Sequence, residues 1–248
     1  MKYFIVLAVV LSLMSCQEEK KEITASEIIN NAIDSAGGPL YKQATIEFKF
    51  RENHYKSVRN GGEFHLERTS EDTLGNTYRD ILSNTGFERY RNDTLVKVAD
   101  STARNLGSSV NSVHYFADLP YGLNDKAVNK SLAGDAVING EHYYQVKITF
   151  QQDGGGAAHH DKFMYWINKK TFTVDYLAYK FHEDKTGIRF RVAYNPREIN
   201  GIRFVDYKNY TVEDPNTDLA TLDELYEQGK LSLLSDIKTE DVQVKIRE

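Results

Sequence analysis

The stretch that decides the fold is DKFMYWINKKTFTVDYLAYKFH, residues 161–182. The turn-forming sequence NKK divides it into two runs rich in aromatic and β-branched residues, which predicts a β-hairpin. Successive side chains of a strand point to opposite faces, so Phe163 and Tyr165 share one face while Met164 and Trp166 share the other. Both faces are apolar, and we therefore expect other parts of the chain to cover both sides of this hairpin.

Similar strand patterns recur along most of the chain. Apolar and polar residues alternate through 44–51, 63–67, 145–150 and 188–194, as in antiparallel strands with one face against the core. Further strands are expected over 75–83, 86–90, 94–99, 161–168, 173–182 and 202–210. Asn-Gly and other turn sequences separate many of these segments, which is typical of hairpins. The fold class that we predict is mainly β, an α+β arrangement built on a large antiparallel sheet.

Two segments break the strand pattern. Residues 24–36 are expected to form a helix, because Thr24 and Glu27 fit a capping box and apolar residues follow at helical spacing. The second segment, 102–134, contains a short helix over 108–118 followed by an apolar loop. It is either a cap over the concave face of the sheet or a simple crossover connection.

The tail beyond Pro215 changes character again. We expect a helix over 219–228 and a last strand that contains Val242, Val244 and Ile246. The predicted organisation is a signal peptide (1–15), a lipidated tether (16–23), a β domain (24–214) and a helix–strand tail (215–248).

The first sixteen residues indicate export. The apolar run 4–14 follows a short positive segment, has the length of a signal peptide and is too short to span a bilayer. The sequence LMSC that ends at Cys16 resembles a bacterial lipobox, with Met14 in a less usual middle position. This resemblance implies that Cys16 becomes the N-terminus and carries a diacylglycerol and an amide-linked acyl chain such as palmitate. The alternative is a plain signal peptide with an incidental cysteine.

A lipidated Cys16 predicts a stable membrane anchor, because each buried methylene contributes about 0.8 kcal/mol. The segment QEEKKE at 17–22 is then a solvated tether. Its acidic pair resembles the surface-export signal of lipoproteins in Bacteroidetes-type bacteria, and a plain polar linker explains it equally well. We expect an envelope protein anchored at the outer membrane, facing the periplasm or the cell surface. Cys16 is the single cysteine, so the mature chain has no disulfide.

The composition is that of a globular protein with a sizeable core. The 248 residues are 40% hydrophobic and 27% charged, with a formal net charge of −5. The basic residues are scattered, whereas a nucleic-acid groove gathers them in a stripe, so we expect no nucleic-acid partner.

One series of motifs resembles a known superfamily. The segments VINGEHYYQV at 137–146, YWIN at 165–168 and VDY at 174–176, with Thr171 after the turn, are similar to the motif order of lipoprotein carriers of the LolA/LolB-like superfamily. The resemblance covers about residues 24–210. It implies a curved half-barrel sheet that wraps a helical lid over a hydrophobic cavity. The whole chain is also similar to a family of flavobacterial lipoproteins, a resemblance that carries no activity.

The aromatic residues of the strands allow two interpretations. The 16 Tyr and 12 Phe could line a cavity for an acyl chain or another apolar ligand. They could equally fill a solid core, since aromatic residues favour strands. For the cavity, we expect a lid over 108–123 and lining residues on both sheet and lid: Phe48, Phe64, Tyr165, Tyr176, Val113 and Phe116.

A metal site is a weaker hypothesis. His159, His160 and Asp161 precede one strand of the 161–182 hairpin and His182 ends the other, so pairing brings them together. Imidazole and carboxylate ligands of this kind suit Zn²⁺. Polar residues are also normal at the open end of a hairpin, and we assign no metal and no cofactor.

The sequence contains none of the common catalytic motifs. The sequence has no G-x-S-x-G, H-E-x-x-H or P-loop motif, and its single cysteine is assigned to the anchor. We therefore predict a lipid-anchored envelope protein that binds or holds a lipid or acyl chain without catalysis. Two alternatives stay open: a surface-displayed protein- or glycan-binding module without a cavity, and a metal-dependent hydrolase.

Overall fold

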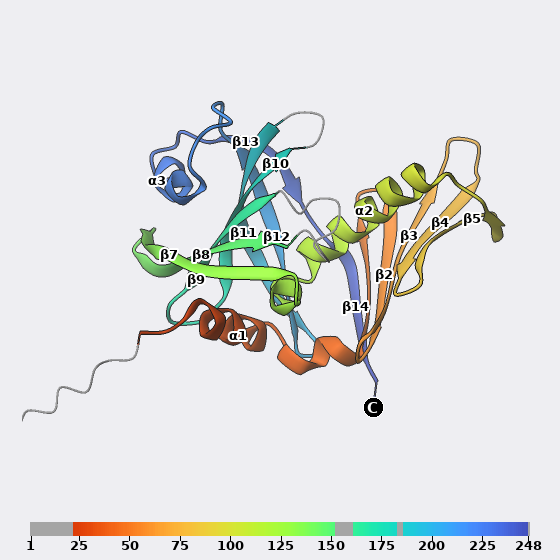
Figure 1. The fold of residues 1–248 in the computed structure, drawn as a ribbon, viewed down its shortest axis with the longest axis horizontal. Helices are drawn as coiled ribbons and strands as arrows, with labels where there is room; N and C mark the ends of the chain where they lie inside the picture. The colour runs from red at the N-terminus through yellow and green to blue at the C-terminus, as the bar shows by residue number, and fades with distance from the viewer. Residues whose placement is uncertain (1–21, 152–160, 183–185, 248) are drawn as a thin grey trace, which may run out of the picture.

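The computed structural model describes residues 22–151, 161–182 and 186–247, and their strands form two antiparallel sheets (Figure 1). The N-terminal sheet has the order β14-β1-β2-β3-β4-β5-β6, and the C-terminal sheet has the order β13-β12-β11-β10-β9-β8-β7. The strands of the N-terminal sheet are β1 (Ala44–Phe50), β2 (Asn53–Asn60), β3 (Glu63–Glu71), β4 (Thr77–Ser83), β5 (Gly86–Arg91), β6 (Thr94–Val96) and β14 (Glu240–Ile246). Those of the C-terminal sheet are β7 (Val128–Ile138), β8 (Glu141–Phe150), β9 (Lys162–Asn168), β10 (Val174–His182), β11 (Thr186–Ile199), β12 (Ile202–Thr211) and β13 (Ser232–Ile237).

Two-residue turns fix the register of several hairpins. Asn139-Gly140 joins β7 to β8 with φ values of 51° and 81°, and Asn200-Gly201 joins β11 to β12 with 48° and 81°. Positive φ at both turn residues is the type I′ geometry, which matches the twist of the paired strands and favours Asn-Gly. These turns are the ones that the sequence marks as hairpin connections.

The C-terminal segment completes both sheets. β13 pairs with β12, and β14 pairs with β1, placing Val244 opposite Ile46. The segment between β13 and β14 is short, so the chain passes directly from the C-terminal sheet to the N-terminal sheet. At this point β14 of one sheet contacts β11 of the other. The two strands within the predicted tail, Ser232–Ile237 and Glu240–Ile246, thus each extend one of the two sheets.

Helices lie at the ends of the sheets and between them. They are α1 (Ala25–Ser35), the 3-10 turn η1 (Gly38–Gln43), α2 (Asp100–Ala117), η2 (Tyr121–Asn124), η3 (Leu219–Thr221) and α3 (Leu222–Glu227). The capping box of α1 is confirmed: Glu27 N donates to Thr24 Oγ1 at 3.2 Å, and Thr24 N donates to Glu27 Oε2 at 2.8 Å. α1 ends at Ser35, and at Gly37 a Cβ would lie 2.9 Å from the carbonyl oxygen of Gly201, so the chain that leaves the helix passes close to the β11–β12 turn.

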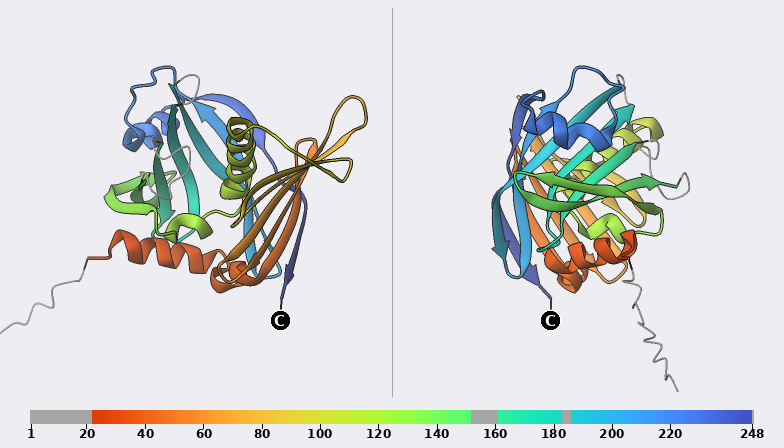
Figure 2. Two further views of the ribbon diagram at one scale, coloured as in Figure 1. Left: turned by 45° about the vertical axis from the view of Figure 1, so that its right-hand side comes forward. Right: turned by 90° about the vertical axis from the view of Figure 1, so that its left-hand side faces the viewer.

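The two sheets diverge as an open half-barrel, and α2 stands in the space between them (Figures 1 and 2). An inner core fills this space with side chains from both sheets, α1 and α2. A separate outer core lies on the far face of the C-terminal sheet, beneath α3 and the chain around it (Figure 2, right). Both faces of the 161–182 hairpin are therefore covered, as its sequence predicts.

The mainly β fold with an N-terminal helix and a helix between strand runs is confirmed. The structure differs from the predicted elements in three places. β2 was not predicted, most of β7 lies in the segment 102–134 that was expected to break the strand pattern, and β13 lies in a stretch assigned to no element. The helix of the middle segment is also longer than expected, since α2 begins eight residues before 108.

Candidate functional site

α2 supplies the side chains that fill the space between the sheets. Its buried residues recur at helical spacing along one face, while the other face is exposed: Gly107, Val110, Val113, His114 and Phe116. At Gly107 the helix comes close to the N-terminal sheet, because a Cβ there would lie 3.5 Å from Leu82 Cδ1 and 3.5 Å from Phe87 Cδ2. α2 therefore covers β3, β4 and β5 closely while presenting few large apolar residues.

His114 is enclosed by aromatic rings in the inner core. Its ring lies edge-on to Phe48 at 5.7 Å and to Tyr55 at 5.6 Å, and the latter two rings stack at 5.4 Å. Its Nε2 donates to the carbonyl oxygen of Glu67 at 3.1 Å, and Nδ1 has no partner among the described residues. Burial lowers the pKa of His114, more than the nearby Asp118 carboxylate raises it, so the ring is neutral at pH 7.

Near its C-terminal end, α2 meets the C-terminal sheet through aromatic side chains. Tyr115 OH lies 2.9 Å from Tyr165 OH, and the Tyr115 ring lies 6.0 Å from Phe163 and 6.3 Å from Phe150. Phe163 stacks on Tyr179 at 5.5 Å. Most of these rings are only half-buried, so the seam between α2 and the C-terminal sheet is apolar and partly open to solvent.

The C-terminal end of α2 is held by one balanced ion pair. Arg59 Nη2 donates to Asp118 Oδ2 at 2.9 Å, and both side chains are largely buried. The same guanidinium lies 4.9 Å from the ring of Tyr121, which stacks on Tyr41 at 4.8 Å. One cation here faces one anion, so this end of the helix carries no excess charge.

A second charged group lies on the face of the N-terminal sheet that α2 covers. Asp80 is fully buried and receives hydrogen bonds from Arg89 Nε at 2.6 Å, Arg89 Nη2 at 2.9 Å and Arg68 Nη2 at 2.6 Å. Arg68 Nη1 also donates to Ser109 Oγ of α2 at 2.8 Å. Burial alone would raise the pKa of Asp80, but the hydrogen bonds from Arg89 and Arg68 outweigh it and hold the pKa below its ordinary value.

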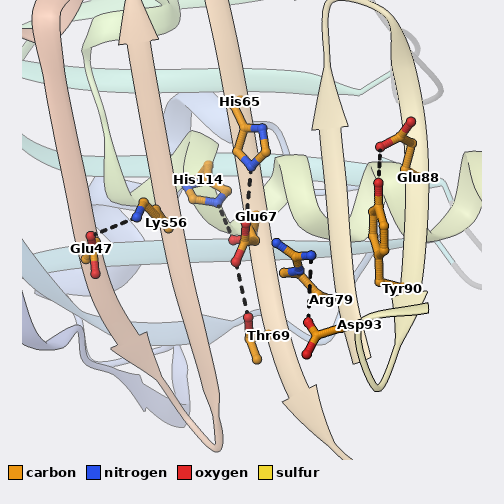
Figure 3. A network of polar contacts seen from close by, with 10 residues as sticks. All are labelled: Glu47, Lys56, His65, Glu67, Thr69, Arg79, Glu88, Tyr90, Asp93 and His114. Atoms are coloured by element: carbon orange, nitrogen blue, oxygen red, sulfur yellow. Dashed lines mark hydrogen bonds and ion pairs between the residues drawn. The ribbon is translucent and has the colours of Figure 1, made fainter. Parts of the chain in front are cut away.

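The opposite face of the N-terminal sheet is a polar surface (Figure 3). Lys56 and Glu47 form an ion pair at 3.3 Å, and Tyr90 OH donates to Glu88 Oε2 at 3.1 Å. Arg79 lies 3.9 Å from Asp93 on the same side. Pairs of this kind are exposed and contribute little to stability, so we assign this face no ligand.

The structure places four of the six predicted cavity residues in the inner core: Phe48, Tyr165, Val113 and Phe116. Tyr176 lies on the other side of the C-terminal sheet, in the outer core, where it contacts Tyr143 and Tyr226. The reason is register: Tyr176 pairs with Trp166 after an irregularity at Val174, and so shares the outer face of Trp166.

Phe64 lies outside the inner core as well. It lines a shallow surface groove of about 350 Å³ at the start of β3, beside His65, Asn84 and Arg247. A second groove of about 370 Å³ runs along the start of α1, at Glu22, Ile23 and Glu27. Neither groove reaches the space that α2 fills.

The metal hypothesis falls mostly outside the described residues. His159 and His160 lie in 152–160, and Cys16 lies in 1–21, so two of the four candidate ligands and the anchor lie outside the described residues. Asp161 is half-buried, and His182 ends β10. Over the described parts of the chain, no three His, Cys, Asp or Glu side chains gather in a way that could hold a metal ion.

Sequence reasoning missed two features of the inner face. His114 is assigned no role from the sequence, although the spacing of Val110, Val113 and His114 on one helix face indicates burial. The charged network was missed because Arg68 and Asp80 are ordinary charged residues in the sequence. Each of them nevertheless shares its strand face with an apolar residue, Leu66 or Leu82. That pattern was a usable signal for buried charge.

One known structure supports the fold assignment. The chain is similar to a LolA superfamily protein from Nitrosomonas europaea at 13% identity, with a TM-score of 0.50 and coverage of 92% of this chain and 95% of that one. It is also similar to a DUF1329 family protein from Desulfovibrio piger at 12% identity, with a TM-score of 0.47 and coverage of 88% and 92%. At this identity the likeness is one of fold, and the fold is LolA-like.

Sequence comparison gives the family. No curated protein sequence matches the chain. None of the helices in the described residues has the length and apolar character needed to cross a membrane. The profile of one sequence family matches residues 1–239, and the chain therefore belongs to DUF6503, a family of unknown function.

Proposed function

We propose that this chain binds a lipid or another long apolar ligand between its two sheets, without catalysis, while an acyl anchor on Cys16 holds it at a membrane of the cell envelope. The observation that carries the proposal is the position of α2. This helix fills the space between two sheets whose facing side chains are largely aromatic and aliphatic. When α2 moves off the face of the N-terminal sheet, those side chains become the walls of a ligand site.

The composition of α2 supports such a movement. Only five of its 18 residues are buried, and one of these is Gly107. Segments with few buried apolar contacts belong to the less stable parts of a fold and open most readily. Each buried methylene of a ligand contributes about 0.8 kcal/mol, so a long acyl chain can offset the loss of the α2 packing.

The chemistry of the walls supports an apolar ligand. Ile148, Tyr165 and Ile167 of the C-terminal sheet are fully buried and face Ile46 and Phe48 of the N-terminal sheet across the inner core. Ligand sites of this kind are mostly apolar with a few placed polar groups, which Tyr165 and His114 supply here.

A lipid anchor limits where the protein can bind and release a ligand. A protein held by acyl chains on Cys16 accepts or holds a ligand at its own membrane and does not cross the periplasm with it.

Expression of the full chain with labelled palmitate tests the anchor. We expect label on the wild-type chain and none on Cys16→Ala, and label on both would contradict the anchor.

The ligand is tested on the chain from Gln17 to Glu248, which contains every described helix and strand. The protein is purified from cells without detergent and extracted with organic solvent, and the extract is examined by mass spectrometry. Binding of the neutral apolar fluorophore N-phenyl-1-naphthylamine is measured in parallel. We expect one extracted lipid or one bound fluorophore per chain. A protein that yields no lipid and binds no fluorophore has a permanently filled core, and the proposal is then wrong.

A further inference from the structure

The face of the N-terminal sheet that α2 covers changes from apolar to cationic along the sheet. On β1 this face carries Ala44, Ile46 and Phe48, all buried. On β2 it carries Tyr55, which pairs with Arg68 of β3. Arg68 pairs in turn with Asp80 of β4, and Asp80 with Arg89 of β5. The apolar space between the sheets is therefore continuous with the charged network through Tyr55.

The charged network contains more cationic groups than anionic groups. Two guanidinium groups, those of Arg68 and Arg89, share the single carboxylate of Asp80. Among the described residues, Asp80 is the one carboxylate within ion-pair distance of either arginine. The Arg59–Asp118 pair at the other end of α2 is balanced one to one. One positive charge is thus left over beneath the N-terminal half of α2.

The network also has unused hydrogen-bonding capacity. Arg68 Nε is buried and has no partner in the described structure, and the Arg68 side chain is only 14% exposed. Arg68 Nη1 is satisfied by the hydroxyl of Ser109, a neutral group on α2 itself. Withdrawal of α2 removes that hydroxyl, so Arg68, which also lies within hydrogen-bonding reach of Tyr55, presents available donors at the edge of the apolar space. Guanidinium donors bind carboxylate and phosphate oxygens more strongly than hydroxyl groups.

We propose that Arg68 and Arg89 form the head-group subsite of the ligand site, and that the preferred ligand is an anionic amphiphile whose carboxylate or phosphate replaces Ser109 at Arg68. This inference rests on the proposed function, because it requires an apolar ligand between the sheets. It adds the charge of the ligand, the place of its head group and its direction, with the acyl chain running past Tyr55 toward Phe48.

The test compares three probes with the same chain and different head groups: dodecanoate, dodecyl phosphate and dodecan-1-ol. Each displaces N-phenyl-1-naphthylamine from the chain 17–248 at pH 7.5, and the dissociation constants are compared. We expect at least one of the two anions to bind about tenfold or more tightly than the alcohol, as for a hydrogen bond to a charged group. A stronger preference for dodecanoate indicates a fatty acid, and a stronger preference for dodecyl phosphate indicates a phospholipid-type head group.

Variants test which residues cause the preference for an anionic head group. Arg68→Gln leaves the bidentate Arg89–Asp80 pair in place and removes the excess charge, so the ratio between alcohol and anion constants should fall to about one or two. Ser109→Asp reaches the same result without removing a buried group, because an exposed residue then presents a carboxylate to Arg68. The matched control is Arg79→Gln. Arg79 precedes Asp80 on β4, but its guanidinium lies on the opposite face, 4.8 Å from the Tyr90 ring (Figure 3).

The outcomes separate the two proposals. Equal constants for the three probes on the wild-type chain overturn the head-group subsite and leave apolar binding intact. Failure of all three probes to displace the bound fluorophore overturns the head-group subsite, and failure of the fluorophore and all three probes to bind overturns both proposals. An anion preference that survives in Arg68→Gln and Ser109→Asp, or that disappears equally in Arg79→Gln, also overturns the subsite, because the preference then comes from the overall charge of the protein.

Discussion

Tyr115 of α2 and Tyr165 of β9 bring their hydroxyl groups to 2.9 Å across the space between the two sheets. Burial raises the pKa of both hydroxyls, so each is protonated at neutral pH and one donates to the other. This hydrogen bond ties α2 to the C-terminal sheet, while Arg68–Ser109 and His114–Glu67 tie it to the N-terminal sheet. α2 is thus fixed in place by a small number of identifiable polar contacts.

Single removal of either tyrosine hydroxyl should destabilise the fold. Tyr115→Phe or Tyr165→Phe leaves one buried hydroxyl without its partner, which costs about 1–3 kcal/mol of unfolding free energy. The double variant removes both groups and should cost less than the sum of the two single variants. Urea unfolding of the four proteins measures this coupling, and strictly additive costs would contradict the hydrogen bond.

Asp80→Asn should be among the more damaging single substitutions on the inner face. The change leaves Arg68 and Arg89 buried without an anion, which costs about 3–5 kcal/mol. Because the folded-state pKa of Asp80 is lowered, its stabilisation is complete above the ordinary carboxyl pKa near 3.8 and is lost as the pH falls below that value. Unfolding curves recorded from pH 6 to pH 2 should therefore show a steeper loss for the wild-type chain than for the variant. Parallel slopes would be inconsistent with the ion network.

His114 should make the packing of α2 sensitive to mild acid. Burial lowers its folded-state pKa, so below about pH 6.5 the unfolded chain binds a proton that the folded chain does not. The free energy of unfolding should decrease as the pH falls from 7 toward 5, and less so in His114→Phe. The other histidines are present in both proteins, so the difference between the two pH profiles isolates His114. Identical profiles would show that His114 titrates normally.

The two faces of the C-terminal sheet should respond differently to truncation. Tyr226→Ala removes a ring of α3 that lies 5.4 Å from Phe190 and 5.5 Å from Tyr210 in the outer core, and should cost about 2 kcal/mol of stability. Phe116→Ala removes a comparable ring from the inner core. We expect only the inner-core variant to change the affinity for N-phenyl-1-naphthylamine. A loss of affinity in Tyr226→Ala would indicate that the ligand binds at the outer core, which would contradict the proposed site between the sheets.

Most of the strands, the capped helix α1 and the coverage of the 161–182 hairpin could be predicted from alternation, capping and turn residues. The location of the site could be predicted only in part. Alternation shows which residues share a face, but not which face is concave, and the irregularity beside Val174 moved Tyr176 to the outer face. β13 pairs with β12 beyond an intervening helix, and β14 pairs with β1 near the other end of the chain, and no local sequence pattern reports such pairing. Arg68, Asp80 and Arg89 are ordinary residues in sequence, and only their pairing across three strands makes them a network.

The movement of α2 away from the N-terminal sheet is the central claim, and a reversible disulfide tests it most directly. A Cβ at position 107 would lie 3.9 Å from Phe87 Cβ, within the range of about 3.5–4.5 Å that disulfides require. The variant Gly107→Cys/Phe87→Cys is made in the chain 17–248, which contains no other cysteine. We predict that the oxidised protein binds N-phenyl-1-naphthylamine and dodecanoate at least tenfold more weakly than the same protein after reduction. Equal affinity before and after reduction, with the disulfide verified by mass, would contradict the account.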